Sequence, residues 1–223
     1  MMARDKAKAG RRGGGGENTA IRERRRQQLI DSTMASIAKR GFAETTMGDV
    51  AKGAKLSHGI VNFHFNSKDQ LLVETLRYVT EEYRSNWTRA VAKAGPDVAD
   101  KLAAFYLADF DPTVCTRNKL AVWHAFYGEA KSRPTYREIC GASDLQRIDA
   151  GIELVRRIIA EGDYRHLDPA STARGLDALT DGLWLQLLLS TDRFDRDGAR
   201  ETVRAFLAHA FPKHFTLAER DAA

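Results

Sequence analysis

The sequence contains little cysteine and no long apolar run, and each of these shortages excludes a class of protein. Only Cys115 and Cys140 are present among 223 residues, and no CxxC pair occurs, so we expect reduced thiols in a cytoplasmic protein rather than a disulfide scaffold. The most apolar segment, 183–189, is far too short to cross a bilayer. No apolar stretch follows the basic residues near the N-terminus, so no signal peptide and no membrane contact are predicted.

Signals for β-strands and for enzymatic sites are also missing. No segment alternates apolar and polar residues with the period of a strand, and no Asn-Gly hairpin turn occurs. The sequence has no Gly-rich phosphate loop after a strand, no GxSxG motif and no HExxH motif. We therefore predict an all-α protein that is not an enzyme and has no catalytic residues, metal or cofactor.

Positive charge is concentrated at the N-terminal end. The net charge is +5, but residues 1–40 carry 11 Lys and Arg against 4 Asp and Glu, which leaves the remainder slightly acidic. This distribution is typical of an end that meets nucleic-acid phosphates. A basic, solvated tail without a partner is the simpler alternative.

Helical periodicity runs through most of the chain. Gly41 is the predicted stop of the first helix. Ser67 and Gln70 form a capping box that starts a long helix, which continues to a break at Gly95-Pro96. The helices predicted on either side of this long one span residues 22–39, 97–110, 118–130, 134–161, 169–190 and 198–211.

Residues 46–65 have the pattern of a helix-turn-helix. Thr46 is the predicted N-cap of the first helix, and Asp49 stands three residues further on. Apolar residues then recur at i, i+3, i+4 and i+7, namely Met47, Val50, Ala51 and Ala54. A short turn at 55–56 leads to Ser57, which is a suitable N-cap for the second helix.

The second helix is predicted to bury Val61 and Phe65 on one face. The side chains left on the other faces are His58, Ile60, Asn62 and Phe63. A short helix with bond-capable groups near its N-terminus suits the DNA major groove. Spacing alone leaves open an ordinary helical hairpin within a bundle.

The segment 45–68 resembles the DNA-binding domain of the tetracycline-repressor (TetR) family. That family has a Thr-rich start, an Asp-(Ile/Val)-Ala core, Ala-Gly-Val-Ser, a Gly two residues on, and an aromatic-Phe-x-Ser-Lys close. The matching residues are Thr45, Thr46, Asp49, Val50, Ala51, Ala54, Leu56, Ser57, Gly59, His64, Phe65, Ser67 and Lys68. Lys55 replaces the usual turn glycine, which implies a turn without positive φ or one with modest strain. Asn62 replaces the usual phosphate-contacting Tyr and could bond a base edge instead.

The resemblance implies double-stranded DNA as a partner. Thr46, Ser57 and Lys68 would contact phosphates, and His64 belongs to the same DNA-binding set. The residues expected to face base edges are His58, Ile60, Asn62 and Phe63. The family also implies a homodimer on a pseudo-palindromic operator, whose half-sites lie about 34–36 Å apart or a multiple of it. The resemblance places the dimer contact on the last two long helices, around 148–159 and 176–188.

The resemblance continues into the second half of the chain. Segments 109–136 and 179–190 are similar to the effector domain of the choline-responsive repressors of betaine synthesis. Trp123, Phe126 and Tyr127 form a stripe at i, i+3 and i+4, and Asp181 precedes Trp184 on another helix. Core packing explains such stripes by spacing alone. The resemblance favours a cation–π cage for a quaternary amine, with Asp181, Asp109 or Asp111 supplying negative charge.

Together these observations predict a ligand-responsive, cytoplasmic repressor that controls choline-to-betaine genes and is released by choline. Repression of another pathway, with a different cationic or hydrophobic effector, stays open. The predicted organisation comprises a disordered basic, Gly-rich tail (1–20), a DNA-binding unit (21–83), a helical effector-binding and dimerisation domain (84–215) and a C-terminal tail (216–223). A purely architectural DNA-binding protein is a further alternative, although it would not need so large a second domain.

Overall fold

The computed structural model describes residues 14–216, and every regular element within them is helical, with no strand. The all-α prediction is therefore confirmed. The elements are α1 (Gly14–Arg40), α2 (Met47–Gly53), α3 (His58–His64), α4 (Lys68–Lys93), α5 (Val98–Leu107), the short 3-10 helix η1 (Ala108–Phe110), α6 (Arg117–Glu129), α7 (Pro134–Gly162), α8 (Pro169–Leu189) and α9 (Arg196–Ala210). None of the helices in this part of the chain combines the length and the apolar content needed to span a bilayer.

The first helix begins earlier than its apolar pattern predicts. Residues 14–20 belong to α1, so the expectation of disorder is wrong there, whereas 1–13 and 217–223 lie outside the described residues. Residues 16–20 are exposed, so packing does not explain this extension. Once a helix exists, each added residue gains a backbone hydrogen bond, and Glu17 in the first turn interacts favourably with the helix dipole.

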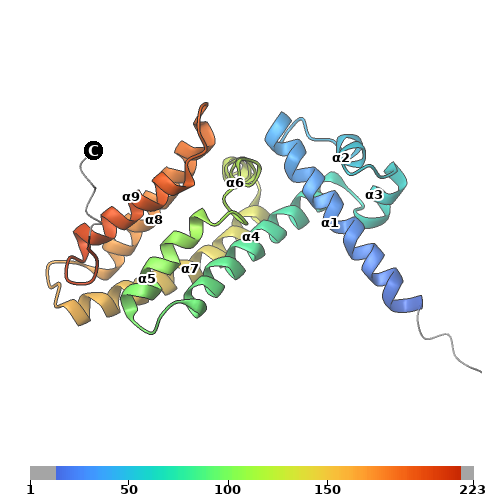
Figure 1. Cartoon of the computed structure of the whole chain (residues 1–223). Helices are drawn as coiled ribbons and strands as arrows, with labels where there is room; N and C mark the ends of the chain where they lie inside the picture. The colour runs from blue at the N-terminus through green and yellow to red at the C-terminus, as the bar shows by residue number, and fades with distance from the viewer. Residues whose placement is uncertain (1–13, 217–223) are drawn as a thin grey trace, which may run out of the picture.

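Helices α1, α2 and α3 form a small unit at one end of the molecule (Figure 1). Gly41 ends α1 at φ +86° and donates its N–H to the Ile37 oxygen, as the predicted stop requires. Gly53 lets α2 approach α1, because a Cβ there would lie 2.3 Å from the Ser32 hydroxyl oxygen. The Ser32 hydroxyl donates to the Val50 oxygen, which fixes this crossing.

The long helix α4 leaves this unit and runs beside α5 and α7 (Figure 1). Its N-cap is Ser67, which accepts from the Gln70 N–H as predicted, while the Gln70 side chain accepts from the Asn66 N–H. The apolar and threonine side chains of its inner face are all buried, namely Leu71, Leu72, Thr75, Leu76 and Val79. Because α4 passes without interruption from one unit into the other, the two units are joined by a continuous helix.

Helices α5 to α9 form the larger, C-terminal part of the molecule. Helix α7 packs along α4, α5 and α8, and α9 lies against α5 and α8 at the far end (Figure 1). Helix α6 packs against α1, so the two parts of the molecule meet there as well as through α4. Cys115 and Cys140 are both buried free thiols, and burial raises their pKa to about 12 and about 11.

Candidate functional site

The helix-turn-helix has the caps that its sequence predicts. The Thr46 hydroxyl oxygen accepts from the Asp49 N–H, and its O–H donates to the Asp49 carboxylate at 2.6 Å. The Ser57 hydroxyl oxygen accepts from the Ile60 N–H. Lys55 has φ +55°, so of the two alternatives for this turn the strained one is correct.

The two faces of α3 separate as predicted. Val61 and Phe65 are buried, whereas Phe63 is 66 % exposed. His58 and Asn62 are exposed one turn apart, with Nδ1 of His58 3.3 Å from the Asn62 side-chain nitrogen. The exposed face of α3 therefore carries polar groups and one large ring.

Positive charge lies beside this face. The Arg22 guanidinium of α1 is 5.5 Å from the centroid of the Phe63 ring. The pKa of His64 is lowered, first by burial and then by the nearby charges of Arg22 and Arg25, so His64 is mainly neutral at pH 7. A neutral imidazole at this position can act as both hydrogen-bond donor and acceptor.

Lys68 has an internal contact that its sequence does not reveal. Its ammonium donates to the Ala43 oxygen at 2.8 Å, which ties the start of α4 to the loop after α1. An ammonium has three N–H groups, so the others remain available for an anion. Lys68 thus both braces the helix-turn-helix and presents charge beside it.

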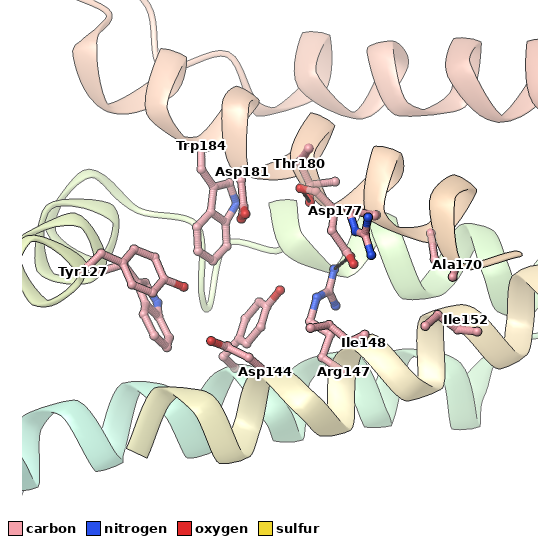
Figure 2. A pocket seen from close by; sticks show the side chains of 15 residues that line it. Tyr127, Asp144, Arg147, Ile148, Ile152, Ala170, Asp177, Thr180, Asp181 and Trp184 are labelled. Carbon is pink, nitrogen blue, oxygen red and sulfur yellow. Dashed lines mark hydrogen bonds and ion pairs between the residues drawn. The ribbon is translucent and has the colours of Figure 1, made fainter. Parts of the chain in front are cut away.

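A second feature is a cavity of about 570 Å³ among α4, α6, α7 and α8 (Figure 2). Most of its wall comes from one face of α8 and one face of α7, while α6 closes one end. Its lining residues are Tyr83, Trp123, Tyr127, Asp144, Arg147, Ile148, Ile152, Ala170, Ala173, Arg174, Asp177, Ala178, Thr180, Asp181 and Trp184.

Four aromatic rings meet at the α6 end of this cavity. The ring centroid of Tyr83 lies 5.8 Å from that of Trp123 and 5.5 Å from that of Trp184. The ring centroids of Trp123 and Tyr127 are 5.7 Å apart. The Trp184 indole N–H donates to the main-chain carbonyl oxygen of Asp109 at 2.9 Å, which holds this indole against the wall. Predicted candidates Trp123, Tyr127 and Trp184 are therefore brought together.

The cavity also carries an excess of carboxylates. Arg147 donates to Asp109 at 2.8 Å, and both side chains are buried, so this pair is self-neutralising. Asp144, Asp177 and Asp181 remain against the single positive charge of Arg174, and Asp144 and Asp181 flank the ring-lined end (Figure 2). Burial raises the pKa of Asp177 to about 6 and raises that of Asp144. A cation within the cavity would stabilise the charged form of each.

Three predicted effector-site residues lie elsewhere. Phe126 is fully buried on the other side of α6, and its ring centroid is 5.4 Å from that of Phe42 and 5.1 Å from that of Tyr136. Asp109 lies behind the wall, where its charge is balanced by Arg147. Asp111 accepts from the N–H and the hydroxyl of Thr113 in the loop before α6. None of the three lines the cavity, so a cage built in this cavity would not include them.

Several lining residues are absent from the sequence-based set, most importantly Tyr83, Asp144, Arg147 and Asp177. The spacing of Asp177, Asp181 and Trp184 at i, i+4 and i+7 was an available signal, because it places two carboxylates and an indole on one helical face. Tyr83 and Arg147 carry no comparable signal. They reach the cavity only through the packing of α4 and α7.

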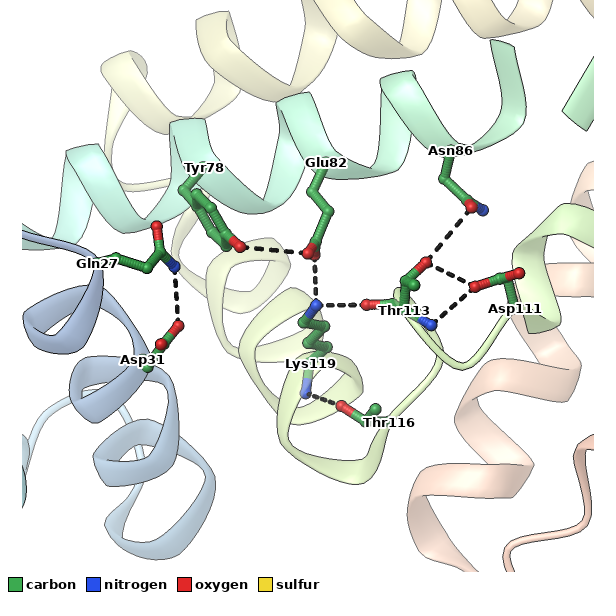
Figure 3. A network of polar contacts seen from close by, with 9 residues as sticks. All are labelled: Gln27, Asp31, Tyr78, Glu82, Asn86, Asp111, Thr113, Thr116 and Lys119. Carbon is green, nitrogen blue, oxygen red and sulfur yellow. Dashed lines mark hydrogen bonds and ion pairs between the residues drawn. The ribbon is translucent and has the colours of Figure 1, made fainter. Parts of the chain in front are cut away.

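Polar contacts connect α6 and the loop before it to α4 (Figure 3). The Lys119 ammonium donates to the Glu82 carboxylate and to the main-chain carbonyl oxygen of Thr113, and the Tyr78 hydroxyl donates to Glu82 at 3.3 Å. The Thr113 hydroxyl also lies 3.4 Å from the Asn86 side-chain oxygen. These contacts fix the start of α6 to the middle of α4.

Comparisons with known proteins agree with this architecture. The model of the bacterial regulatory proteins of the tetR family matches residues 29–75, and the model of the BetI-type transcriptional repressor C-terminal domain matches residues 98–212. The HTH-type transcriptional regulator BetI of Paraburkholderia xenovorans is 35 % identical over 193 residues, which cover 84 % of this chain and 93 % of that protein. The BetI regulator of Burkholderia mallei is also 35 % identical, over 191 residues and the same shares of the two chains.

Solved structures share the fold. A putative transcriptional regulator from Pseudomonas aeruginosa PAO1 superimposes with a TM-score of 0.72 at 25 % identity, over 87 % of this chain and 95 % of that one. A putative regulator from Saccharomonospora viridis, solved in complex with choline, gives a TM-score of 0.71 at 21 % identity, over 84 % and 97 %. These families and relatives are transcriptional regulators rather than enzymes. With a capped helix-turn-helix at one end and the BetI-type domain over 98–212, the chain belongs to the BetI-type transcriptional repressors of the TetR family.

Proposed function

We propose that this repressor binds a pseudo-palindromic operator as a homodimer and releases it when choline or a related quaternary amine enters the cavity. The observation that carries the proposal is the ring-lined, carboxylate-rich end of the cavity. A quaternary ammonium cannot donate hydrogen bonds, so its recognition depends on ring faces and negative charge. Trp123, Tyr127 and Trp184 offer the rings, and Asp144 and Asp181 offer the charge.

The relatives support this ligand class. The regulator from S. viridis was solved with choline bound, and the relatives of the present chain are BetI regulators. The proposed ligand therefore agrees both with the chemistry of the cavity and with the names of the chain's relatives. Control of choline-to-betaine genes follows as the proposed physiological role, exercised in the cytoplasm where the operator would lie.

For DNA, we propose that residues 21–83 form the binding unit and that α3 enters the major groove. Thr46, Ser57 and Lys68 would position the protein on phosphates. The base edges would be faced by His58, Ile60, Asn62 and Phe63, and His64 belongs to the same DNA-binding set. The exposure of Phe63 and the adjacent arginine of α1 support this orientation.

For the dimer, we propose a contact through α8 and α9 within the effector domain, residues 84–215. Leu185 and Leu189 of α8 and Phe206 of α9 are large apolar side chains left exposed within one chain. In the other predicted segment, 148–159, Ile148 is 42 % exposed, whereas Val155 and Ile158 are fully buried inside the subunit. In many homodimers, an exposed apolar face of one subunit packs against the same face of its symmetric partner.

The effect of ligand binding would reach the DNA-binding unit through α6. One side of this helix carries Trp123 and Tyr127, and the other side carries Phe126 against Phe42 of the DNA-binding unit. A ligand that draws α6 toward the rings would change this contact and, through the polar network, the position of α4. Shifting a protein almost completely between two states takes about 5.5 kcal/mol of differential affinity.

A different effector is the second candidate, and the size of the cavity favours it. At about 570 Å³ the cavity falls in the range of drug-sized ligands, so it has room for a cation larger than choline. Ile148 and Ile152 at the far end would contact an apolar extension.

The test is a titration of operator-bound protein with choline, larger quaternary amines and neutral analogues of matching shape. We expect cations to release the DNA and neutral analogues to have no effect. Release by neutral compounds alone would contradict the cationic ligand, and DNA binding without sequence preference would contradict the operator model. The dimer is checked separately by sedimentation of the wild-type protein and of Phe206→Ser, which we expect to weaken association.

A further inference from the structure

The start of α1 is basic and exposed. Four of the five residues 22–26 are arginines, and Arg22, Arg24 and Arg25 are exposed to solvent. This end of the helix projects beyond α3 in Figure 1. The tetR-family model matches the chain from residue 29 onward, so these arginines lie outside the matched segment. They are therefore a feature of this chain that the family match does not explain.

The arginines lie on two opposite sides of α1. Successive residues of an α-helix are turned by about 100°, so Arg22, Arg25 and Arg26 share one side. Arg24 lies on the opposite side. The shared side faces α3, because the Arg22 guanidinium lies over the Phe63 ring, 5.5 Å from its centroid. One side of α1 and the exposed face of α3 are thus neighbours on the surface.

Two of the three arginines on this side keep an unneutralised charge. Arg26 is paired with the Glu74 carboxylate. Within residues 14–216, no carboxylate lies within ion-pair distance of Arg22 or Arg25. Their charges also reach α3, because the pKa of His64 is lowered first by burial and then by Arg22 and Arg25. Two positive charges therefore stand beside the helix that would enter the major groove.

The Arg22 side chain is oriented to bind an anion. A guanidinium that lies over an aromatic ring uses its flat face, so the N–H groups at its edge stay free. These N–H groups match two oxygens of a phosphate, and arginine forms bidentate contacts of this kind. A helix in the major groove is bordered by the phosphates of both strands. DNA phosphates are therefore the anions nearest to this side of α1 when α3 is in place.

We propose that Arg22 and Arg25 contact phosphates of the operator and make the start of α1 a second DNA-contacting helix beside α3. This inference rests on the proposed function, because it requires α3 to enter the groove. Contacts to phosphates carry no direct sequence information. The two arginines therefore strengthen binding and fix the orientation of the DNA-binding unit without reading bases.

The first measurement is the salt dependence of binding by full-length variants to an operator that the wild-type protein selects from random DNA. Arg22→Ala and Arg25→Ala should each reduce the slope by about one unit and lower the affinity roughly tenfold at about 0.1 M salt. Arg24→Ala removes the same charge from the opposite side of α1 and should keep the wild-type slope. Alanine favours the helix, so none of these changes should unwind α1, and melting curves without DNA check this.

The second measurement locates the contacts on the DNA. A methylphosphonate in place of one phosphate removes a single negative charge at a known position, and such replacements are made one by one along the operator. The wild-type protein should lose affinity at each phosphate that it contacts. Arg22→Ala should become insensitive at one of these positions and Arg25→Ala at another, whereas Arg24→Ala should retain the wild-type pattern.

Wild-type slopes and methylphosphonate patterns in both Arg22→Ala and Arg25→Ala would overturn the inference while leaving operator binding by α3 intact; the basic side of α1 would then face a partner other than DNA. A slope reduced equally in Arg24→Ala would also overturn it, because the charge would then act at a distance rather than through a contact. If the wild-type protein selects no operator, the proposed function fails and this inference fails with it.

Discussion

The ring of Phe126 meets the ring of Phe42 edge to face, with their centroids 5.4 Å apart. Phe42 belongs to the loop after α1, so this contact joins α6 to the DNA-binding unit. The next residue, Tyr127, points into the cavity and is 44 % exposed. Of these two adjacent aromatic residues, Phe126 therefore contacts the DNA-binding unit and Tyr127 lines the cavity.

This arrangement predicts opposite phenotypes for neighbouring substitutions. Tyr127→Leu should lower choline affinity by about 1 kcal/mol, because it removes a ring face that attracts the cation. Its melting temperature should stay near that of the wild type, since the ring is half exposed. Phe126→Leu should instead destabilise the fold by about 1–2 kcal/mol and alter operator affinity without ligand. Calorimetry and melting curves on both variants check the pair, and a selective loss of choline binding in Phe126→Leu would contradict it.

Choline affinity should fall as the solution is acidified from pH 7.5 to pH 5.5. Burial raises the pKa of Asp177 to about 6, so acidification protonates this carboxylate and removes its attraction for a cation. The charged groups around it are Arg147, Asp109, Asp144 and Asp181, with Arg174 in the same cavity wall, and Asp144 should reinforce the trend because its pKa is also raised. Binding near pH 6 should therefore release protons. Titrations in buffers of different ionisation enthalpy measure that release, and an affinity independent of pH would show that these carboxylates do not contact the cation.

Lys55→Gly should stabilise the helix-turn-helix. Lys55 adopts φ +55°, a conformation that costs non-glycine residues about 1 kcal/mol, whereas glycine adopts it freely. We expect a gain of roughly 0.5 kcal/mol in the free energy of unfolding, measured with urea, after allowance for the greater entropy of glycine in the unfolded chain. Lys55→Ala removes the same charge but keeps the strained backbone, so it should give no gain. Equal stability of the two variants would show that the turn relaxes.

Two substitutions in the DNA-binding unit should distinguish residues that position the protein on phosphates from residues that recognise bases. Lys68→Ala should weaken binding about equally on all sequences and reduce the salt dependence by about one unit of slope. Asn62→Ala should change preference at one or two base positions by roughly 1–3 kcal/mol each. Binding measured across a set of operator variants distinguishes them. A uniform loss for Asn62→Ala would identify Asn62 as a phosphate contact.

The DNA-binding unit could be predicted from the sequence because its signals are local. Thr46, Ser57 and Ser67 are caps that depend only on residues two or three positions away, and all three act as expected. The backbone conformation of Lys55 stayed open, because either conformation was compatible with its neighbours.

The cavity could be predicted only in part. Trp123 and Tyr127 lie four residues apart, which places them about 40° from each other around the helix, whereas Phe126 and Tyr127 are about 100° apart. The stripe therefore divides between two sides of α6, and Phe126 belongs to the core. Arg147 and Tyr83 enter the wall through contacts distant in sequence, and periodicity carries no information about those.

The two buried cysteines make the protein well suited to distance measurements. Thiol reagents react with the thiolate, and the raised pKa values of Cys115 and Cys140 keep that form scarce near neutral pH. A cysteine introduced at an exposed position such as Phe63 should therefore be labelled selectively in the natural background. Spin labels at that position, one on each recognition helix of a dimer, would report their separation with and without inducer, and so show directly whether the ligand changes the reach of the protein across its operator.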